Sequence, residues 1–164
     1  MSSRNMTLSC VFALALAAAS SSAALADAVV KVSLWDKGGM MDMSKNMGMG
    51  MGMHGNMKMA IMGIDINQKS VPAGKVTFDV NNASKETIHE MIVTSVANTD
   101  AVLPYNANEN RVEEDQAGDL GEVSELEPGK SGTLSVDMKP GTYVLYCNVP
   151  GHFMAGMWTT ITVQ

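Results

Sequence analysis

The chain has 164 residues, of which 17 are acidic and 11 are Lys or Arg, and its net charge at pH 7 is −6. This length suits one domain plus additional segments. The acidic balance argues against binding to nucleic acids or to anionic membrane surfaces, and it favours a basic surface on any protein partner.

The N-terminal segment has the pattern of a secretory signal peptide. Arg4 precedes an apolar run over residues 8–19, and small residues follow up to an A-x-A sequence at residues 24–26. The apolar run is too short to span a membrane, and no later stretch is long enough. We therefore expect cleavage after residue 26 and export to the periplasm. Cleavage would remove Cys10 and leave a mature domain over residues 27–164, with about seven excess negative charges and Cys147 as its only cysteine.

Short β-strands dominate the rest of the chain. They alternate apolar and polar residues, or carry β-branched residues, and Pro/Gly turns separate them. The polar segment over residues 97–120 is expected to be irregular, with a short helix near residues 108–115. No long helical period is present, so the sequence predicts an all-β fold, a β-sandwich. We expect strands over residues 29–35, 59–67, 76–80, 90–96, 131–138, 142–147 and 158–163.

A Met/Gly-rich insertion over about residues 38–63 separates the first two predicted strands, and it contains ten methionines. Thioethers are soft ligands that prefer Cu(I), and alternate residues of an extended chain lie on one face. The sequence therefore predicts a second, Cu(I)-binding site formed by Met47, Met49, Met51, Met53 and His54. The alternative is a passive, flexible low-complexity loop.

The segment YCNVPGHFMAGM places Cys147, His152 and Met157 five residues apart. A single cysteine in an exported protein is explained by an intermolecular disulfide, an inert buried side chain or a metal site. One thiolate, two imidazoles and a weak axial thioether form the ligand set of a type 1 copper centre. Besides His152 the chain has two histidines, His54 and His89. Because His89 directly precedes an apolar strand, it is the predicted second imidazole.

Two features of the same loop leave alternatives open. Met154 competes with Met157 as the axial ligand, and we favour Met157 because four intervening residues let the chain turn back under the metal. Asn148 is expected to hold the loop through side-chain hydrogen bonds. Pro150, Phe153 and Met154 flank the loop histidine, where they would dock a redox partner, shield the metal from water, or do both.

These features together resemble the cupredoxins, the plastocyanin/azurin type of small copper protein. The resemblance covers residues 29–164 apart from the Met-rich insertion. It is carried by the first strand, VPAGKVTFDVNN at residues 71–82, the His89-Glu90 pair, and GTYVLYCNVPGHFMAGM at residues 141–157. The Cys-x4-His-x4-Met spacing is similar to that of the rusticyanin and auracyanin branch.

The resemblance implies a Greek-key β-sandwich in which His89, Cys147, His152 and Met157 bind one type 1 copper ion. One position departs from the family pattern, because Glu90 stands where many cupredoxins have Asn or Ser. The reduction potential and the blue or green colour are therefore not transferred from the family.

The leading functional prediction is an exported, monomeric carrier of single electrons that serves a redox partner and transforms no substrate. The alternative is a copper-handling or copper-tolerance protein whose Met-rich insertion captures Cu(I). We do not expect an enzyme: multicopper oxidases and copper nitrite reductases have a histidine directly beside the type 1 cysteine, and here its neighbours are Tyr146 and Asn148. Zinc is disfavoured because a thioether is a poor zinc ligand.

Overall fold

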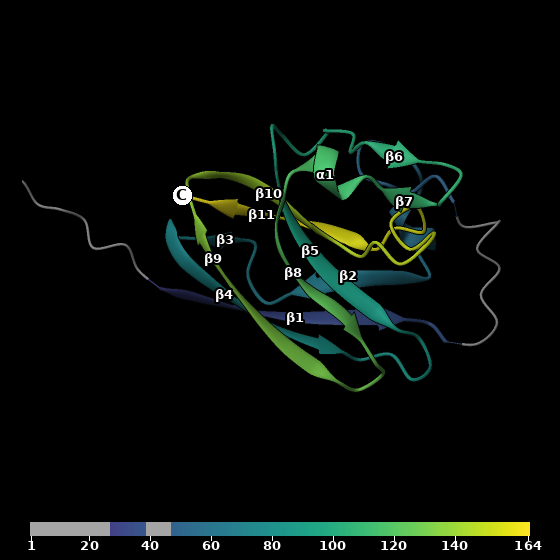
Figure 1. Ribbon diagram of the computed structural model, residues 1–164, viewed down its shortest axis with the longest axis horizontal. Coiled ribbons are helices and arrows are strands. Elements are labelled where there is room, and N and C mark those ends of the chain that lie inside the picture. Colours follow the sequence, from purple (N-terminus) through teal and green to yellow (C-terminus); the bar gives the residue numbers. More distant parts are fainter. Residues whose placement is uncertain (1–26, 39–46) are drawn as a thin grey trace, which may run out of the picture.

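The computed structural model describes residues 27–38 and 47–164. The predicted signal peptide and the first three methionines of the insertion lie outside the described residues. Two β-sheets pack face to face, and the short elements β6, β7 and α1 lie on the far side of β5, β10 and β11 from β1 and β4 (Figure 1). The predicted all-β sandwich is confirmed.

The first sheet has four strands in the order β2-β1-β4-β9. β1 pairs with β4 in parallel, and the other two pairs are antiparallel. Side chains of β1 alternate between the core and solvent, because a strand directs successive residues to opposite faces: Val30, Val32 and Leu34 are buried and Val29 and Lys31 are exposed. The strands are β1 (Ala28–Asp36), β2 (Met62–Ile66), β4 (Gly74–Asn82) and β9 (Ser131–Met138).

The second sheet has five strands in the order β3-β11-β10-β5-β8. Only the β11–β3 pair is parallel. β5 is buried along six consecutive residues, which indicates that both of its faces are covered. The strands are β3 (Ser70–Val71), β5 (His89–Val96), β8 (Asp119–Leu126), β10 (Gly141–Tyr146) and β11 (Trp158–Val163).

Two apolar clusters explain this double coverage. The main core contains side chains of both sheets, among them Leu34, Phe78 and Ile161. A second cluster, here called the outer cluster, covers the other face of the five-stranded sheet. It consists of Met51, Ile92, Leu103, Val112, Val144, Tyr146 and Phe153. A methionine of the Met-rich insertion is therefore part of the packed interior.

The irregular segment differs from its prediction. The helix expected near residues 108–115 is instead α1 (Glu114–Ala117), a single turn. A hairpin of β6 (Tyr105–Asn106) and β7 (Arg111–Val112) precedes it and turns through Asn110, whose φ is 55°. That left-handed conformation is incompatible with a helix.

Two strand predictions also need correction. The strand predicted over residues 59–67 begins only at Met62, because the 3₁₀ turn η2 (Met57–Met59) precedes it with Asn56 as its N-cap. The edge strand β8 was not predicted. Val123 is its only buried residue, so its sequence lacks a clear apolar alternation.

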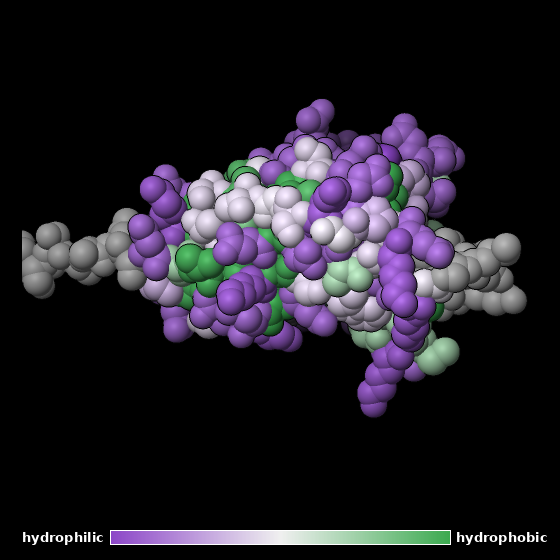
Figure 2. All heavy atoms as spheres, turned by 90° about the horizontal axis from the view of Figure 1, so that it is seen from below, coloured by the Kyte–Doolittle hydropathy of each residue, from purple (hydrophilic) through white to green (hydrophobic). Residues whose placement is uncertain are grey.

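The surface is mixed in character. Figure 2 shows one face on which hydrophobic residues gather in the left half of the view, interrupted by hydrophilic side chains. Among the described residues, no helix is long and apolar enough to cross a membrane.

Candidate metal centre

Strand pairing brings three of the predicted ligands to one end of the five-stranded sheet. His89 is the first residue of β5, Cys147 directly follows β10, and Met157 directly precedes β11. The pairing of β10 with β11 continues past the strand ends, because the Cys147 amide donates to the Met157 carbonyl at 3.1 Å. The chain turns between these two residues, and His152 lies in that turn.

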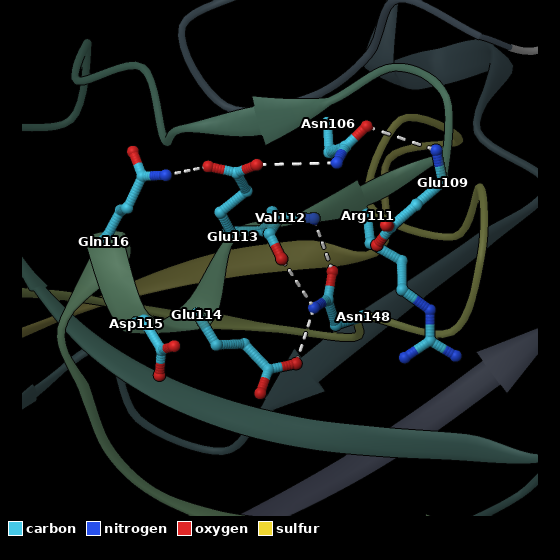
Figure 3. Close-up of a pocket in the computed structure, with 9 residues that line it drawn as sticks. All are labelled: Asn106, Glu109, Arg111, Val112, Glu113, Glu114, Asp115, Gln116 and Asn148. Carbon is cyan, nitrogen blue, oxygen red and sulfur yellow. Dashed lines mark hydrogen bonds between the residues drawn. The ribbon is translucent and has the colours of Figure 1, made fainter.

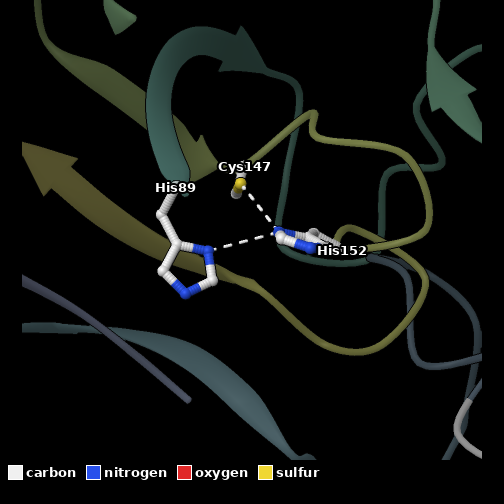
Figure 4. A group of neighbouring side chains, drawn as sticks. All are labelled: His89, Cys147 and His152. Atoms are coloured by element: carbon white, nitrogen blue, oxygen red, sulfur yellow. Dashed lines mark hydrogen bonds between the residues drawn. The ribbon is translucent and has the colours of Figure 1, made fainter. Parts of the chain in front are cut away.

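The side chains of His89, Cys147 and His152 point toward one another (Figure 4). His89 Nδ1 lies 3.2 Å from His152 Nδ1, and Cys147 Sγ lies 3.4 Å from the same His152 atom. The three donor atoms all lie within 4.8 Å of one another. His89 and Cys147 are fully buried and His152 is 6% exposed. One thiol and two imidazoles converging in a water-poor site fit a copper ion.

Asp36 orients His89, although no sequence pattern indicated this role. Its Oδ2 lies 3.1 Å from His89 Nε2, and the two side chains are 2% and 0% exposed. The Asp36 Oδ1 atom accepts a hydrogen bond from the Gly38 amide at 2.7 Å. A carboxylate on the outer nitrogen of a ligand histidine fixes its tautomer and leaves the inner nitrogen free for metal. Here the inner nitrogen is the Nδ1 atom that faces His152.

Burial shapes the protonation of the two histidines. Burial, together with the smaller effect of the neighbouring His89, lowers the pKa of His152 to about 4. Burial also lowers the pKa of His89, although the hydrogen bond and the charge of Asp36 oppose this shift. Burial raises the pKa of Asp36, but hydrogen bonds from Thr87, Gly38 and His89 outweigh it and bring the pKa below its usual value. At neutral pH both imidazoles are therefore uncharged, the form in which they bind metals.

Cys147 contacts the start of strand β5. The amide of Glu90 lies 3.5 Å from Cys147 Sγ. Burial raises the pKa of the thiol to about 12, despite hydrogen bonds from the Glu90 and Val149 amides. The thiol therefore keeps its proton in the metal-free protein, and metal binding must displace that proton.

Glu90, the departure from the family pattern, ties β5 to the loop. Its Oε1 accepts a hydrogen bond from the Asn148 amide at 3.0 Å. Burial raises the pKa of Glu90 to about 7. The side chain is therefore part of the interior beside the cysteine.

Asn148 holds the loop to β7 and α1 through its side chain, as we expect from the sequence. Its side-chain oxygen accepts from the Val112 amide at 2.6 Å, and its nitrogen donates to the Val112 carbonyl at 2.9 Å and to Glu114 at 2.6 Å. Figure 3 shows these contacts at the wall of a pocket of about 450 Å³ that carries several carboxylates. The Gly151 amide also donates to the Asn110 carbonyl. The irregular segment therefore braces the ligand loop from outside.

The two candidate axial methionines have different surroundings. Met157 is fully buried in the main core together with Cys147, and its amide donates to the His152 carbonyl at 3.1 Å. Met154 is partly exposed, and its sulfur lies only 3.0 Å from where a Cβ on Gly50 would be. The Met154 thioether thus packs against the Met-rich insertion.

The Met-rich insertion, where the structure describes it, buries some members of the predicted Cu(I) set and exposes others. It turns at residues 50–53, where the Met53 amide donates to the Gly50 carbonyl. Met49 and Met51 are buried, whereas Met47 and His54 are exposed and Met53 is partly exposed. The insertion also covers the ligand loop, since the Met49 amide donates to the Met154 carbonyl at 2.9 Å. The sequence gives no indication that this insertion packs on the ligand loop.

The predicted docking patch is only partly at the surface. Pro150 is exposed and Met154 is half-buried, but Phe153 is 2% exposed because it belongs to the outer cluster with Met51. Phe153 therefore belongs to the interior and is not part of the exposed surface.

Residues 49–164 match the family described as copper binding proteins of the plastocyanin/azurin family. The chain belongs to this family. Its resident cofactor is copper, and the His89, Cys147 and His152 cluster fits a type 1 copper site of such a cupredoxin. A search of curated proteins found no match.

Solved structures of this cupredoxin's relatives share its fold. Rusticyanin from Thiobacillus ferrooxidans is 17% identical with a TM-score of 0.56, over 84% of this chain and 77% of that one. Auracyanin B is 23% identical with a TM-score of 0.50, over 87% and 92%. The dithionite-reduced auracyanin of Roseiflexus castenholzii is 23% identical with a TM-score of 0.46, over 60% and 86%. The predicted likeness to rusticyanin and auracyanin is therefore seen in the fold.

Proposed function

We propose that this cupredoxin is an exported carrier of single electrons, and that His89, Cys147, His152 and Met157 bind its one type 1 copper ion. The observation that carries this proposal is the convergence of the two Nδ1 atoms and the thiol sulfur within 4.8 Å at a buried end of the sheet. When bound, copper supplies a Cu(I)/Cu(II) couple that accepts and donates one electron.

The protein's part is to hold the donor atoms in place in both oxidation states. Asp36 fixes His89, the Glu90 amide contacts Cys147 Sγ, and Asn148 ties the loop to β7. Side chains that are locked by packing and hydrogen bonds rearrange little when the charge of a site changes. This favours rapid electron transfer over substrate chemistry.

Met157 is the proposed axial ligand. Its burial with Cys147 and the direct backbone hydrogen bond between the two residues support this assignment. The Met154 sulfur packs on Gly50, which gives that side chain a structural role instead.

Electrons would enter and leave near the loop, where Pro150 and Met154 reach the surface. The net charge of −6 favours a redox partner with a basic surface. The leader pattern of residues 1–26 supports export to the periplasm. The neighbours of Cys147 are Tyr146 and Asn148, so the sequence offers no adjacent histidine to connect a second, catalytic copper.

Redox cycling tests the proposal. The mature protein is loaded with Cu(II), reduced with ascorbate and reoxidised with ferricyanide through repeated cycles. The visible absorption should disappear and return fully each time, with one copper ion retained per chain. Release of copper on reduction, or incomplete recovery of the absorption, would contradict an electron-carrier function.

A further inference from the structure

A second group of soft donor atoms lies outside the copper centre, in the part of the Met-rich insertion that the structure describes. A pocket of about 180 Å³ is lined by Met53, His54 and Met57, together with Asp100 and Trp158. Two methionines and one histidine therefore line a single small pocket, together with a tryptophan and an aspartate.

This group differs from the set that the alternation of the sequence predicted. Met49 and Met51 are 4% and 0% exposed, and Met51 packs in the outer cluster. They anchor the insertion to the domain. Met57 is 42% exposed, Met53 is partly exposed and His54 is exposed, so their donor atoms remain accessible. The turn therefore separates the buried Met49 and Met51 from the accessible Met53, His54 and Met57.

The backbone around the pocket is specified by local contacts. Gly52 has a φ of +76°, and a Cβ there would lie 2.7 Å from Val102, so the turn before Met53 requires glycine. Asn56 caps η2 by accepting a hydrogen bond from the Lys58 amide at 3.2 Å, which sets the direction of Met57. These contacts fix the backbone near Met53 and Met57, which line the same pocket although three residues separate them.

Trp158 joins this pocket to the copper centre. Its indole nitrogen donates to the Met49 carbonyl at 2.7 Å, which fixes the ring against the insertion. Trp158 directly follows Met157, and the Met57 sulfur lies 3.5 Å from where a Cβ on Gly156 would be. The pocket therefore adjoins the loop that carries the copper ligands.

We propose that Met53, His54 and Met57 bind one Cu(I) ion in this pocket, beside the indole ring of Trp158. Thioether and imidazole ligands match a soft monovalent cation and discriminate against Mg²⁺ and Ca²⁺, which need oxygen ligands. An aromatic face attracts a cation through its quadrupole, and the Asp100 carboxylate adds negative potential. The protein would then hold a reserve Cu(I) ion next to its electron-transfer centre, which is a copper-handling role.

The test counts Cu(I) ions per chain by anaerobic competition with a chromogenic chelator. The pocket variant carries Met53→Leu and Met57→Leu. The control variant carries Met47→Leu and Met59→Leu, which removes two thioethers from the same insertion at residues that are 36% and 61% exposed and do not line the pocket. Leucine preserves side-chain volume, so both variants should fold. We expect the pocket variant to bind one ion fewer than the wild type and the control to bind as many as the wild type.

Equal stoichiometry in all three proteins would overturn the proposal, and so would an equal loss in both variants. The visible spectrum of the Cu(II)-loaded type 1 centre should be the same in all three, which separates failure of this site from failure of the electron-carrier assignment. As a second readout, Cu(I) added after the type 1 centre has been filled should quench the fluorescence of Trp158 further in a Trp35→Phe background, and the pocket mutations should abolish this further quenching. Further quenching that persists with Met53 and Met57 replaced would also contradict the proposal.

Discussion

The contact between Asp36 and His89 gives the sharpest test of how the fold prepares the copper site. Asp36 accepts hydrogen bonds at both oxygens, from the Gly38 amide and from His89 Nε2. Asp36→Asn keeps the shape of the side chain but has one acceptor oxygen and one NH₂ group. Either the Gly38 amide or His89 Nε2 must then face another donor.

The size of the effect follows from the burial of the pair. The Asp36 and His89 side chains are 2% and 0% exposed, so water cannot replace the lost acceptor. A hydrogen bond to a charged group contributes about 2 kcal/mol, which corresponds to about a 30-fold weaker Cu(II) affinity. This agrees with the roughly 10- to 100-fold losses that follow removal of such partners of ligand histidines. The reduction potential should rise as well, because losing a nearby negative charge disfavours Cu(II) more than Cu(I).

The assay is competition for Cu(II) against a chelator, with potentials measured by voltammetry. Asp65→Asn is the matched control, because it makes the same charge change at an exposed residue of β2. We expect the control to bind Cu(II) as the wild type does. Equal affinities of the Asp36 and Asp65 variants would refute the argument that this carboxylate positions His89.

Three further predictions concern the loop. Met157→Leu should raise the reduction potential without loss of copper, whereas Met154→Leu should leave both the potential and copper binding unchanged. If voltammetry showed a raised potential for Met154→Leu and not for Met157→Leu, the axial ligand would be Met154. Burial raises the pKa of Glu90 to about 7 from an unfolded value of 4.5. Its protonated form therefore contributes stability that is fully present below pH 4.5 and is lost as the pH rises through 7. In the copper-free protein, the unfolding free energy of Glu90→Gln relative to that of the wild type should therefore rise by at most about 3 kcal/mol from pH 4.5 to about pH 8. If urea unfolding gave the same difference at every pH, this reasoning would be refuted. Asn148→Ala leaves the Val112 amide and carbonyl without their partner and should cost about 2 kcal/mol of unfolding free energy; a cost below about 0.5 kcal/mol would show that the loop is held by other contacts.

The parts of the molecule with strong local patterns could be predicted from sequence. The strands over residues 131–138 and 158–163 were predicted to the residue, because apolar alternation and flanking turns define their ends. The family, the fold and the copper cofactor are confirmed by the family match. The assignment of His89, Cys147, His152 and Met157 as the copper ligands stays a prediction.

The parts that depend on tertiary contacts could not be predicted. Nothing local distinguishes Asp36 at the end of β1 from an ordinary surface carboxylate, and its role arises only when β5 brings His89 within 3.1 Å. The alternation in the Met-rich insertion suggests that its sulfurs lie on one face of an extended chain. It gives no sign that Met51 is buried in the outer cluster, because that burial depends on contacts with distant strands. The edge strand β8 lacks apolar alternation because most of it is exposed to solvent.

The most direct test of the central claim is the visible absorption spectrum of the Cu(II)-loaded mature protein, recorded beside that of Cys147→Ser. A thiolate bound to Cu(II) gives an intense charge-transfer band, and a serine hydroxyl cannot. We predict an intense band in the wild type and its complete loss in Cys147→Ser. An intense band that survives the substitution, or a wild type without one, would contradict a type 1 copper centre at Cys147.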